Sequence, residues 1–138
     1  MQKVRDVMTA TPLVVDAGAP LQDAARHMRD HAVGDVLVTD GERLCGIVTD
    51  RDLVVRAMAD GYDPKATTVG QVCSRDLVAV EADDDVQHAV DTMRGRAIRR
   101  VPVIDQGRLA GVVSLGDLAR HNDEESVLAA ISEAPPNG

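Results

Sequence analysis

The sequence predicts an α+β fold in which two βαββα repeats pack sheet to sheet with pseudo-two-fold symmetry. The first observation is an internal repeat: a shift of 65 positions aligns Val4–Arg56 with Val69–His121 without a gap, and 18 of the 53 pairs are identical. The second observation is that both copies carry the same order of short apolar runs and helical spacings. The third is that a three-stranded sheet with helices on one face cannot bury its apolar surface alone, whereas two facing copies can.

The first copy shows the order of elements that both copies share. A short apolar run at Leu13–Val15 predicts a strand, and apolar residues at helical spacing from Leu21 to Ala32 predict a helix. Two further strands are expected at Val36–Thr39 and Leu44–Thr49, joined by a polar turn. A helix from Arg51 to about Ala59 closes the copy.

The second copy repeats this order. A strand is expected at Val78–Val80, a helix between Val86 and Ala97, strands at Val101–Ile104 and Leu109–Ser114, and a closing helix from Gly116 to about His121. We therefore expect repeat 1 over residues 1–60, a linker over 61–68 and repeat 2 over 69–122. Residues 123–138 are expected to form a C-terminal helix and a disordered tail.

Composition narrows the classes of partner. The net charge of −8 argues against binding to nucleic acid or to an anionic membrane, because both need a basic surface. The chain has no Trp, no Phe and a single Tyr, Tyr62, so a planar ligand would have to lie between aliphatic side chains. No apolar run approaches the length of a membrane span, and the N-terminus lacks a signal-peptide core, so we expect a soluble cytoplasmic protein. Cys45 and Cys73 fit no zinc or redox spacing and are interpreted as small buried hydrophobic residues.

The most specific local feature is the last strand-to-helix turn of each copy, GIVTDRDL and GVVSLGDL, which places Thr49 three residues before Asp52 and Ser114 three residues before Asp117. One interpretation is a capping box, which accounts for both pairs without a ligand. The other is a nucleotide site. The helix start and the hydroxyl would then face phosphate, and the carboxylate would accept hydrogen bonds from two vicinal ribose hydroxyls.

The duplicated unit resembles a CBS-domain pair, also called a Bateman module, in its stand-alone form. The matching stretches are VRDVMT at Val4–Thr9, GIVTDRDL, RRVPVID at Arg99–Asp105 and GVVSLGDL, and the resemblance extends from about Val4 to His121. Two copies of the turn at a fixed offset, each preceded by Gly and two aliphatic residues and followed by Leu, make it specific.

The resemblance implies a regulatory module that senses AMP, ADP, ATP or S-adenosylmethionine in clefts between the two repeats, with no required cofactor. It also implies that Asp52 and Asp117 bind the ribose, that Thr49 and Ser114 face the phosphates, and that the residues leading into the first strand of each copy help to hold the base. These are Thr11–Leu13 in the first copy and Asp76–Val78 in the second, with Thr11, Leu13 and Val78 as the candidate contacts. A homodimer is expected as well, formed through aliphatic residues of Arg51–Met58 and of the terminal helix, together with a protein partner that the sequence does not identify.

The two copies differ in charge, so their sites are not expected to be equivalent. Arg51 is a candidate phosphate partner at the first turn, where the second copy has Leu115 and Gly116. Arg99 and Arg100 precede the middle strand of the second copy only. The alternative for all three arginines is a surface salt bridge with a nearby Asp.

No catalytic constellation is present, and we expect a binding protein rather than an enzyme. His27 and His31 lie four residues apart on one predicted helix, but two ligands are too few for a specific metal site. Two functions remain: a nucleotide sensor, and a ligand-free dimerisation or scaffold protein that modulates a partner.

Overall fold

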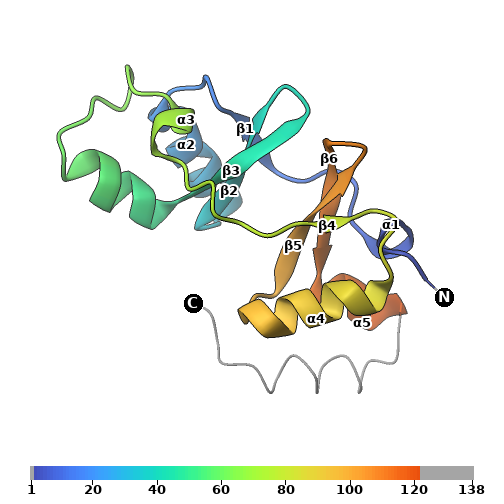
Figure 1. Cartoon of the computed structure of the whole chain (residues 1–138). Coiled ribbons are helices and arrows are strands. Elements are labelled where there is room, and N and C mark those ends of the chain that lie inside the picture. The colour runs from blue at the N-terminus through green and yellow to red at the C-terminus, as the bar shows by residue number, and fades with distance from the viewer. Residues whose placement is uncertain (1, 122–138) are drawn as a thin grey trace. The chain divides into compact units, whose positions relative to one another are not determined.

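The computed structural model describes residues 2–121, which form two three-stranded sheets with their helices (Figure 1). The first sheet has the order β1 (Val14–Asp16), β2 (Asp35–Asp40) and β3 (Arg43–Thr49). The second has the order β4 (Val80–Glu81), β5 (Arg100–Asp105) and β6 (Arg108–Ser114). In each sheet the first strand is parallel to the second, and the second is antiparallel to the third. The predicted α+β class with two repeats is therefore confirmed.

The helices follow the repeat with local differences. The long helices α2 (Leu21–His31) and α4 (Val86–Arg96) lie where the apolar spacing predicts them. The closing helices are η1 (Asp52–Met58) and α5 (Leu115–His121), and η1 is a π-helix in which the N–H of Ala59 donates to the carbonyl of Val54 at 3.0 Å. Two one-turn helices that the sequence analysis did not predict, α1 (Val4–Val7) and α3 (Val69–Val72), precede the first strand of each copy.

The first strands are displaced from their predicted ranges. β1 begins at Val14 rather than Leu13, and β4 begins at Val80 rather than Val78. The ladder of β4 pairs only Val80 and Glu81 with β5, so Val78 packs against the core without belonging to the sheet. Apolar character in these runs therefore reports burial and not strand pairing.

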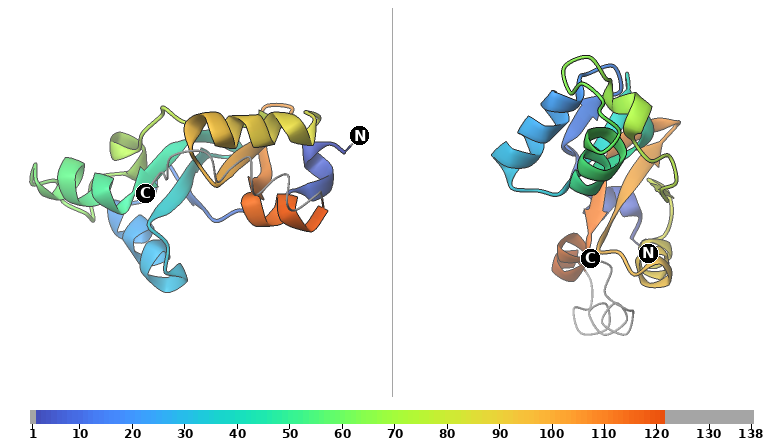
Figure 2. Two further views of the ribbon diagram at one scale, coloured as in Figure 1. Left: turned by 90° about the horizontal axis from the view of Figure 1, so that it is seen from below. Right: turned by 90° about the vertical axis from the view of Figure 1, so that its left-hand side faces the viewer.

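The compact units of the molecule do not coincide with the sequence repeats. Among the described residues, unit 2 is Leu13–Leu77, and unit 1 combines residues 2–12 with residues 78–121. The expected linker, residues 61–68, is part of unit 2, where Leu21 N–H donates to the carbonyl of Thr67 at 3.0 Å. In unit 1, α1 contacts α5, from the other end of the described chain (Figure 2). The expected C-terminal helix and tail over 123–138 lie outside the described residues.

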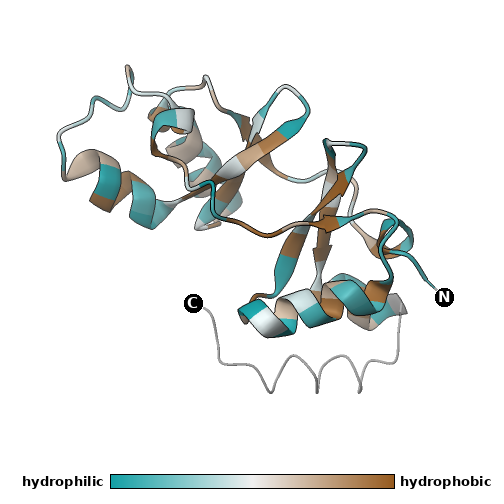
Figure 3. Ribbon diagram, viewed as in Figure 1, coloured by the Kyte–Doolittle hydropathy of each residue, from teal (hydrophilic) through white to brown (hydrophobic). Residues whose placement is uncertain are grey.

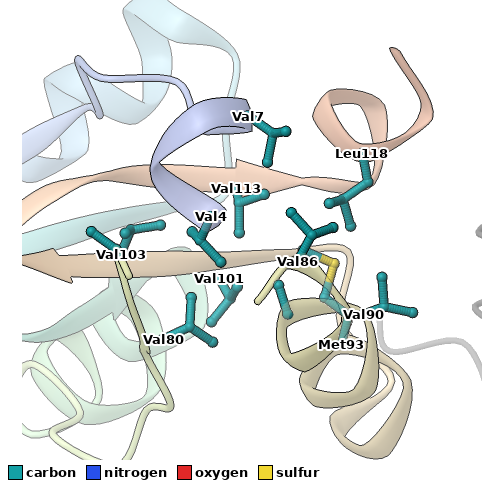
Figure 4. Close-up of a cluster of buried hydrophobic side chains, with 12 residues drawn as sticks. Val4, Val7, Val80, Val86, Val90, Met93, Val101, Val103, Val113 and Leu118 are labelled. Carbon is teal, nitrogen blue, oxygen red and sulfur yellow. The ribbon is translucent and has the colours of Figure 1, made fainter. Parts of the chain in front are cut away.

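Each unit has its own aliphatic core. Apolar residues, coloured brown in Figure 3, occur in the strands and helices of both units. In unit 1, three valines of β5 and β6 pack against Met93 of α4, Val4 of α1 and Leu118 of α5, and all six residues are fully buried (Figure 4). The three valines are Val101, Val103 and Val113. In unit 2 the corresponding valines of β2 and β3 pack against Leu21 and Met28 of α2. The prediction of a core without aromatic residues follows the composition and holds for both units.

Arg5 ties α1 to the rest of unit 1. Its guanidinium donates to Asp83 at 2.9 Å and to Asp105 at 3.4 Å. The hydrogen bond to Asp83 and then that to Asp105 raise the pKa of Arg5 above its ordinary value. The N-terminal segment is therefore anchored by both apolar burial and charge.

Candidate functional site

The strand-to-helix turn of each copy is closed by a reciprocal pair of hydrogen bonds. The N–H of Thr49 donates to Oδ2 of Asp52 at 2.9 Å, and the N–H of Asp52 donates to Oγ1 of Thr49 at 3.0 Å. Ser114 and Asp117 make the same two bonds at 2.9 and 3.1 Å. This is the geometry of a capping box, and it orients each carboxylate by holding its Oδ2 oxygen.

The two carboxylates have different surroundings. The side chain of Asp117 is only 4% exposed, and its Oδ1 accepts a charge-assisted contact from Arg120. The hydroxyl of Thr9 also lies 3.2 and 3.4 Å from the two carboxylate oxygens of Asp117. The side chain of Asp52 is 15% exposed, and the nearest charge to its Oδ1 is Arg56 at 3.9 Å, too far for a hydrogen bond. Asp52 therefore retains acceptor capacity that Asp117 has already used.

The glycine of each motif lets a second segment reach the turn. Ile47 and Ser74 exchange two backbone hydrogen bonds of 2.8 Å, and Thr9 and Val112 exchange two of 2.8 and 3.0 Å. A Cβ on Gly46 would lie 2.2 Å from the carbonyl oxygen of Ser74, so no side chain fits there. A hydroxyl residue therefore flanks each turn, and it comes from the segment that precedes the first strand of the other repeat. Ser74, before β4, flanks the first turn, and Thr9, before β1, flanks the second.

Thr9, Ser74 and Arg120 were missed by the sequence analysis. The 65-residue shift does pair Thr9 with Ser74, and this match of two hydroxyl residues was the available signal. The two side chains have different partners. The hydroxyl of Thr9 lies within hydrogen-bond distance of Asp117, whereas the Oγ of Ser74 accepts from the N–H of Asp76 at 3.4 Å and, within residues 2–121, makes no hydrogen bond to Asp52. Nothing in the sequence indicated a role for Arg120, because the 65-residue shift pairs it with Val55, which is uncharged.

The three predicted arginines lie on the surface. Arg51 is exposed beside Asp52, and among residues 2–121 its side chain has no hydrogen bond or ion pair. The side chain of Arg99 is exposed too, and its carbonyl accepts from the N–H of Leu115 at 2.8 Å. Arg100 is exposed at the start of β5. Of the three candidate phosphate partners, only Arg51 therefore lies on a strand-to-helix turn, next to Asp52.

The residues expected to hold a base are divided between the units. Thr11 is exposed and belongs to unit 1. Leu13 is half-buried against the core of unit 2, and Val78 is half-buried against the core of unit 1. Much of the apolar surface of Leu13 and Val78 is therefore already used in packing.

No group of three or more His, Cys, Asp or Glu side chains in residues 2–121 is arranged to hold a metal ion. The rings of His27 and His31 stack at 5.9 Å, and Nδ1 of His31 lies 3.0 Å from the carbonyl oxygen of His27. Within residues 2–121, every helix falls short of the length and apolar character needed to span a bilayer.

Comparisons with known proteins agree with the repeat. The family model for the CBS domain matches residues 4–58 and again residues 69–124. Hypoxic response protein 1 of Mycobacterium tuberculosis (strain H37Rv) is 36% identical over 129 residues, covering 93% of this chain and 90% of that protein. The CBS domain-containing protein YhcV of Bacillus subtilis is 39% identical over 119 residues, covering 86% and 84%.

Solved structures match over similar lengths. The crystal structure of Hypoxic Response Protein I with two coordinated zinc ions has a TM-score of 0.76 and 37% identity, covering 88% of this chain and 99% of that one. The CBS domain protein PAE2072 from Pyrobaculum aerophilum, complexed with AMP, has a TM-score of 0.70 and 25% identity, covering 93% and 98%. On the two family matches, the close relatives and the shared fold, this chain belongs to the CBS domain family and carries two copies of the domain.

Proposed function

We propose that the chain is a regulatory module that binds an adenosyl ligand, with Asp52 as the main acceptor for the ribose hydroxyls. The observation that carries this proposal is the state of the Asp52 carboxylate. Its Oδ2 is fixed by the N–H of Thr49, while its Oδ1 lies beyond hydrogen-bond distance of the nearest charge. A carboxylate that is oriented on one side and open on the other suits the two hydroxyl donors of a ribose.

Two further facts support an adenosyl ligand. PAE2072, which shares the fold and a quarter of the aligned sequence, is complexed with AMP. Arg51 is exposed next to Asp52 and supplies a cation for a phosphate group. AMP, ADP, ATP and S-adenosylmethionine are all candidates, and they differ in the charge that they bring to the Arg51 side chain. Thr11 and Leu13 remain proposed contacts for the base at this copy.

The experiment is isothermal titration calorimetry with AMP, ATP and S-adenosylmethionine on the full chain, comparing the wild type with Asp52→Asn. Asn keeps an oxygen for the N–H of Thr49 but loses the charge that strengthens bonds to the ribose. A charge-assisted hydrogen bond is worth about 1.5–3 kcal/mol, so affinity should fall about ten- to a hundredfold. Asp60→Asn is the control, because it removes the same charge from an exposed residue outside the turn. Equal affinity in the two variants would contradict the assignment of Asp52.

A ligand-free scaffold is the second candidate, and exposed apolar side chains favour it. Val54, Val55 and Met58 of η1 are 53%, 46% and 71% exposed, and Tyr62 follows at 47%. We name these four residues the η1 surface. Exposed apolar side chains this close in the sequence suit a homodimer contact or an unidentified protein partner. A thermal-shift panel separates the two functions, because a sensor is stabilised by at least one of the three ligands and a scaffold by none.

A further inference from the structure

The carboxylate of Asp117 is already bound by its own chain. The N–H of Ser114 donates to Oδ2, the hydroxyl of Thr9 lies within 3.4 Å of both oxygens, and Arg120 contacts Oδ1. An ionised carboxylate offers about four acceptor positions, and at 4% exposure Asp117 has little surface left for a fourth partner. We name Thr9, Asp117 and Arg120 the Asp117 cluster.

The equivalent position in unit 2 has no such cluster. The 65-residue shift places Val55 where Arg120 stands, and Val55 offers no donor. Ser74 replaces Thr9, and within residues 2–121 its hydroxyl makes no hydrogen bond to Asp52; it accepts from the N–H of Asp76 at 3.4 Å. The two copies therefore differ at both positions: the sequence changes the charge at one of them, and in the structure the hydroxyl at the other has a different partner.

We propose that Arg120 and Thr9 act as internal competitors for the ribose hydroxyls at Asp117, so that one chain binds one adenosyl ligand, at Asp52. The guanidinium and the hydroxyl donate to the same carboxylate oxygens that a ribose would use. A ligand reaches Asp117 only when both donors are displaced. At Asp52 the competing contact among residues 2–121 is the ion pair with Arg56 at 3.9 Å, which is too long for a hydrogen bond and costs less to displace. This inference rests on the proposed adenosyl function and identifies the residues that decide which copy is used.

The first test counts binding sites by isothermal titration calorimetry with AMP and with S-adenosylmethionine. The wild type should bind one molecule of the active probe per chain, and the double variant Arg120→Gln with Thr9→Val should bind two. In the background of Asp52→Asn, the same double change should restore affinity at least tenfold, because it frees acceptors for charge-assisted bonds. Arg94→Gln is the matched control: it removes one exposed arginine from α4 of the same unit and should leave the count at one.

A second measurement does not need a ligand. A water-soluble carbodiimide with an amine, followed by mass spectrometry, labels accessible carboxylates. Asp52 should be labelled in the wild type and Asp117 protected, and the double variant should expose Asp117 while leaving labelling of Asp52 unchanged. Circular dichroism checks that the variants are folded.

The outcomes separate the two proposals. Two binding sites per wild-type chain, or a count that stays at one in the folded double variant, overturns the inference and leaves the adenosyl function standing. If neither probe binds the wild type or the double variant, the adenosyl function fails for these ligands. Carbodiimide labelling is then the remaining test of whether Thr9 and Arg120 block Asp117. Equal labelling of Asp52 and Asp117 in the wild type would overturn the inference.

Discussion

Replacing Gly46 by Ala tests whether the segment at Ser74 is held by the close approach of two backbones. A Cβ at Gly46 would lie 2.2 Å from the carbonyl oxygen of Ser74 and 3.0 Å from its carbonyl carbon, so one backbone must move. The movement breaks the two 2.8 Å hydrogen bonds between Ile47 and Ser74. At about 0.5–1.5 kcal/mol for each bond, unit 2 should lose about 1–3 kcal/mol.

The assay is urea and thermal unfolding followed by circular dichroism. For a unit of this size, each kcal/mol corresponds to about 4–8 °C in Tm, so the shift is easily measured. Gly95→Ala is the control: nothing lies within 4 Å of its added Cβ, and Ala in a helix interior should stabilise the protein by about 0.5–1 kcal/mol. A Gly46→Ala variant as stable as the wild type would refute the argument that this glycine is required by the neighbouring backbone.

Three other predictions follow from burial and backbone geometry. Met93→Ala should lower the free energy of unfolding in urea by about 2–5 kcal/mol, because Met93 is fully buried. Met58→Ala should lower it little, because Met58 is 71% exposed, and equal losses in the two variants would contradict the core assignment. Ala97→Gly should stabilise the chain by about 1 kcal/mol, since Ala97 has a φ of +54° at the end of α4; a decrease in Tm would count against it. If the η1 surface forms a homodimer, Met58→Asp should shift the mass measured by light scattering to that of a monomer, and an unchanged dimer would exclude this surface.

The sequence predicted the elements that depend on local periodicity. α2 and α4 were found because their apolar residues recur at helical spacing, and the β2–β3 hairpin because a polar turn at Gly41 separates two apolar runs. α1 and α3 were missed because a single turn of helix has too few residues to show a period. The π-helical form of η1 was missed because apolar spacing does not distinguish hydrogen bonds to the fourth residue from those to the fifth.

The candidate site was predicted only as far as its local contacts. The pairs Thr49 with Asp52 and Ser114 with Asp117 lie three residues apart, and their spacing alone implies the observed hydrogen bonds. Thr9 lies 108 positions from Asp117, and no local pattern could bring them together. The sequence also predicted that the two binding sites differ, because Arg51, Arg99 and Arg100 have no counterparts in the other copy. In the structure the sites differ for a separate reason: the carboxylate of Asp117 contacts Thr9 and Arg120.

The division of the chain into units after Pro12 and after Leu77 affects which truncated fragments keep their contacts and how a two-repeat protein can have evolved. A fragment that ends in the linker would keep α1 but lose the strand β6 to which Thr9 is bonded. A protein with a single repeat could complete this pairing by exchanging its leading segment with a second molecule. Gene duplication would then have turned an exchange between two subunits into an exchange within one chain, at far higher effective concentration.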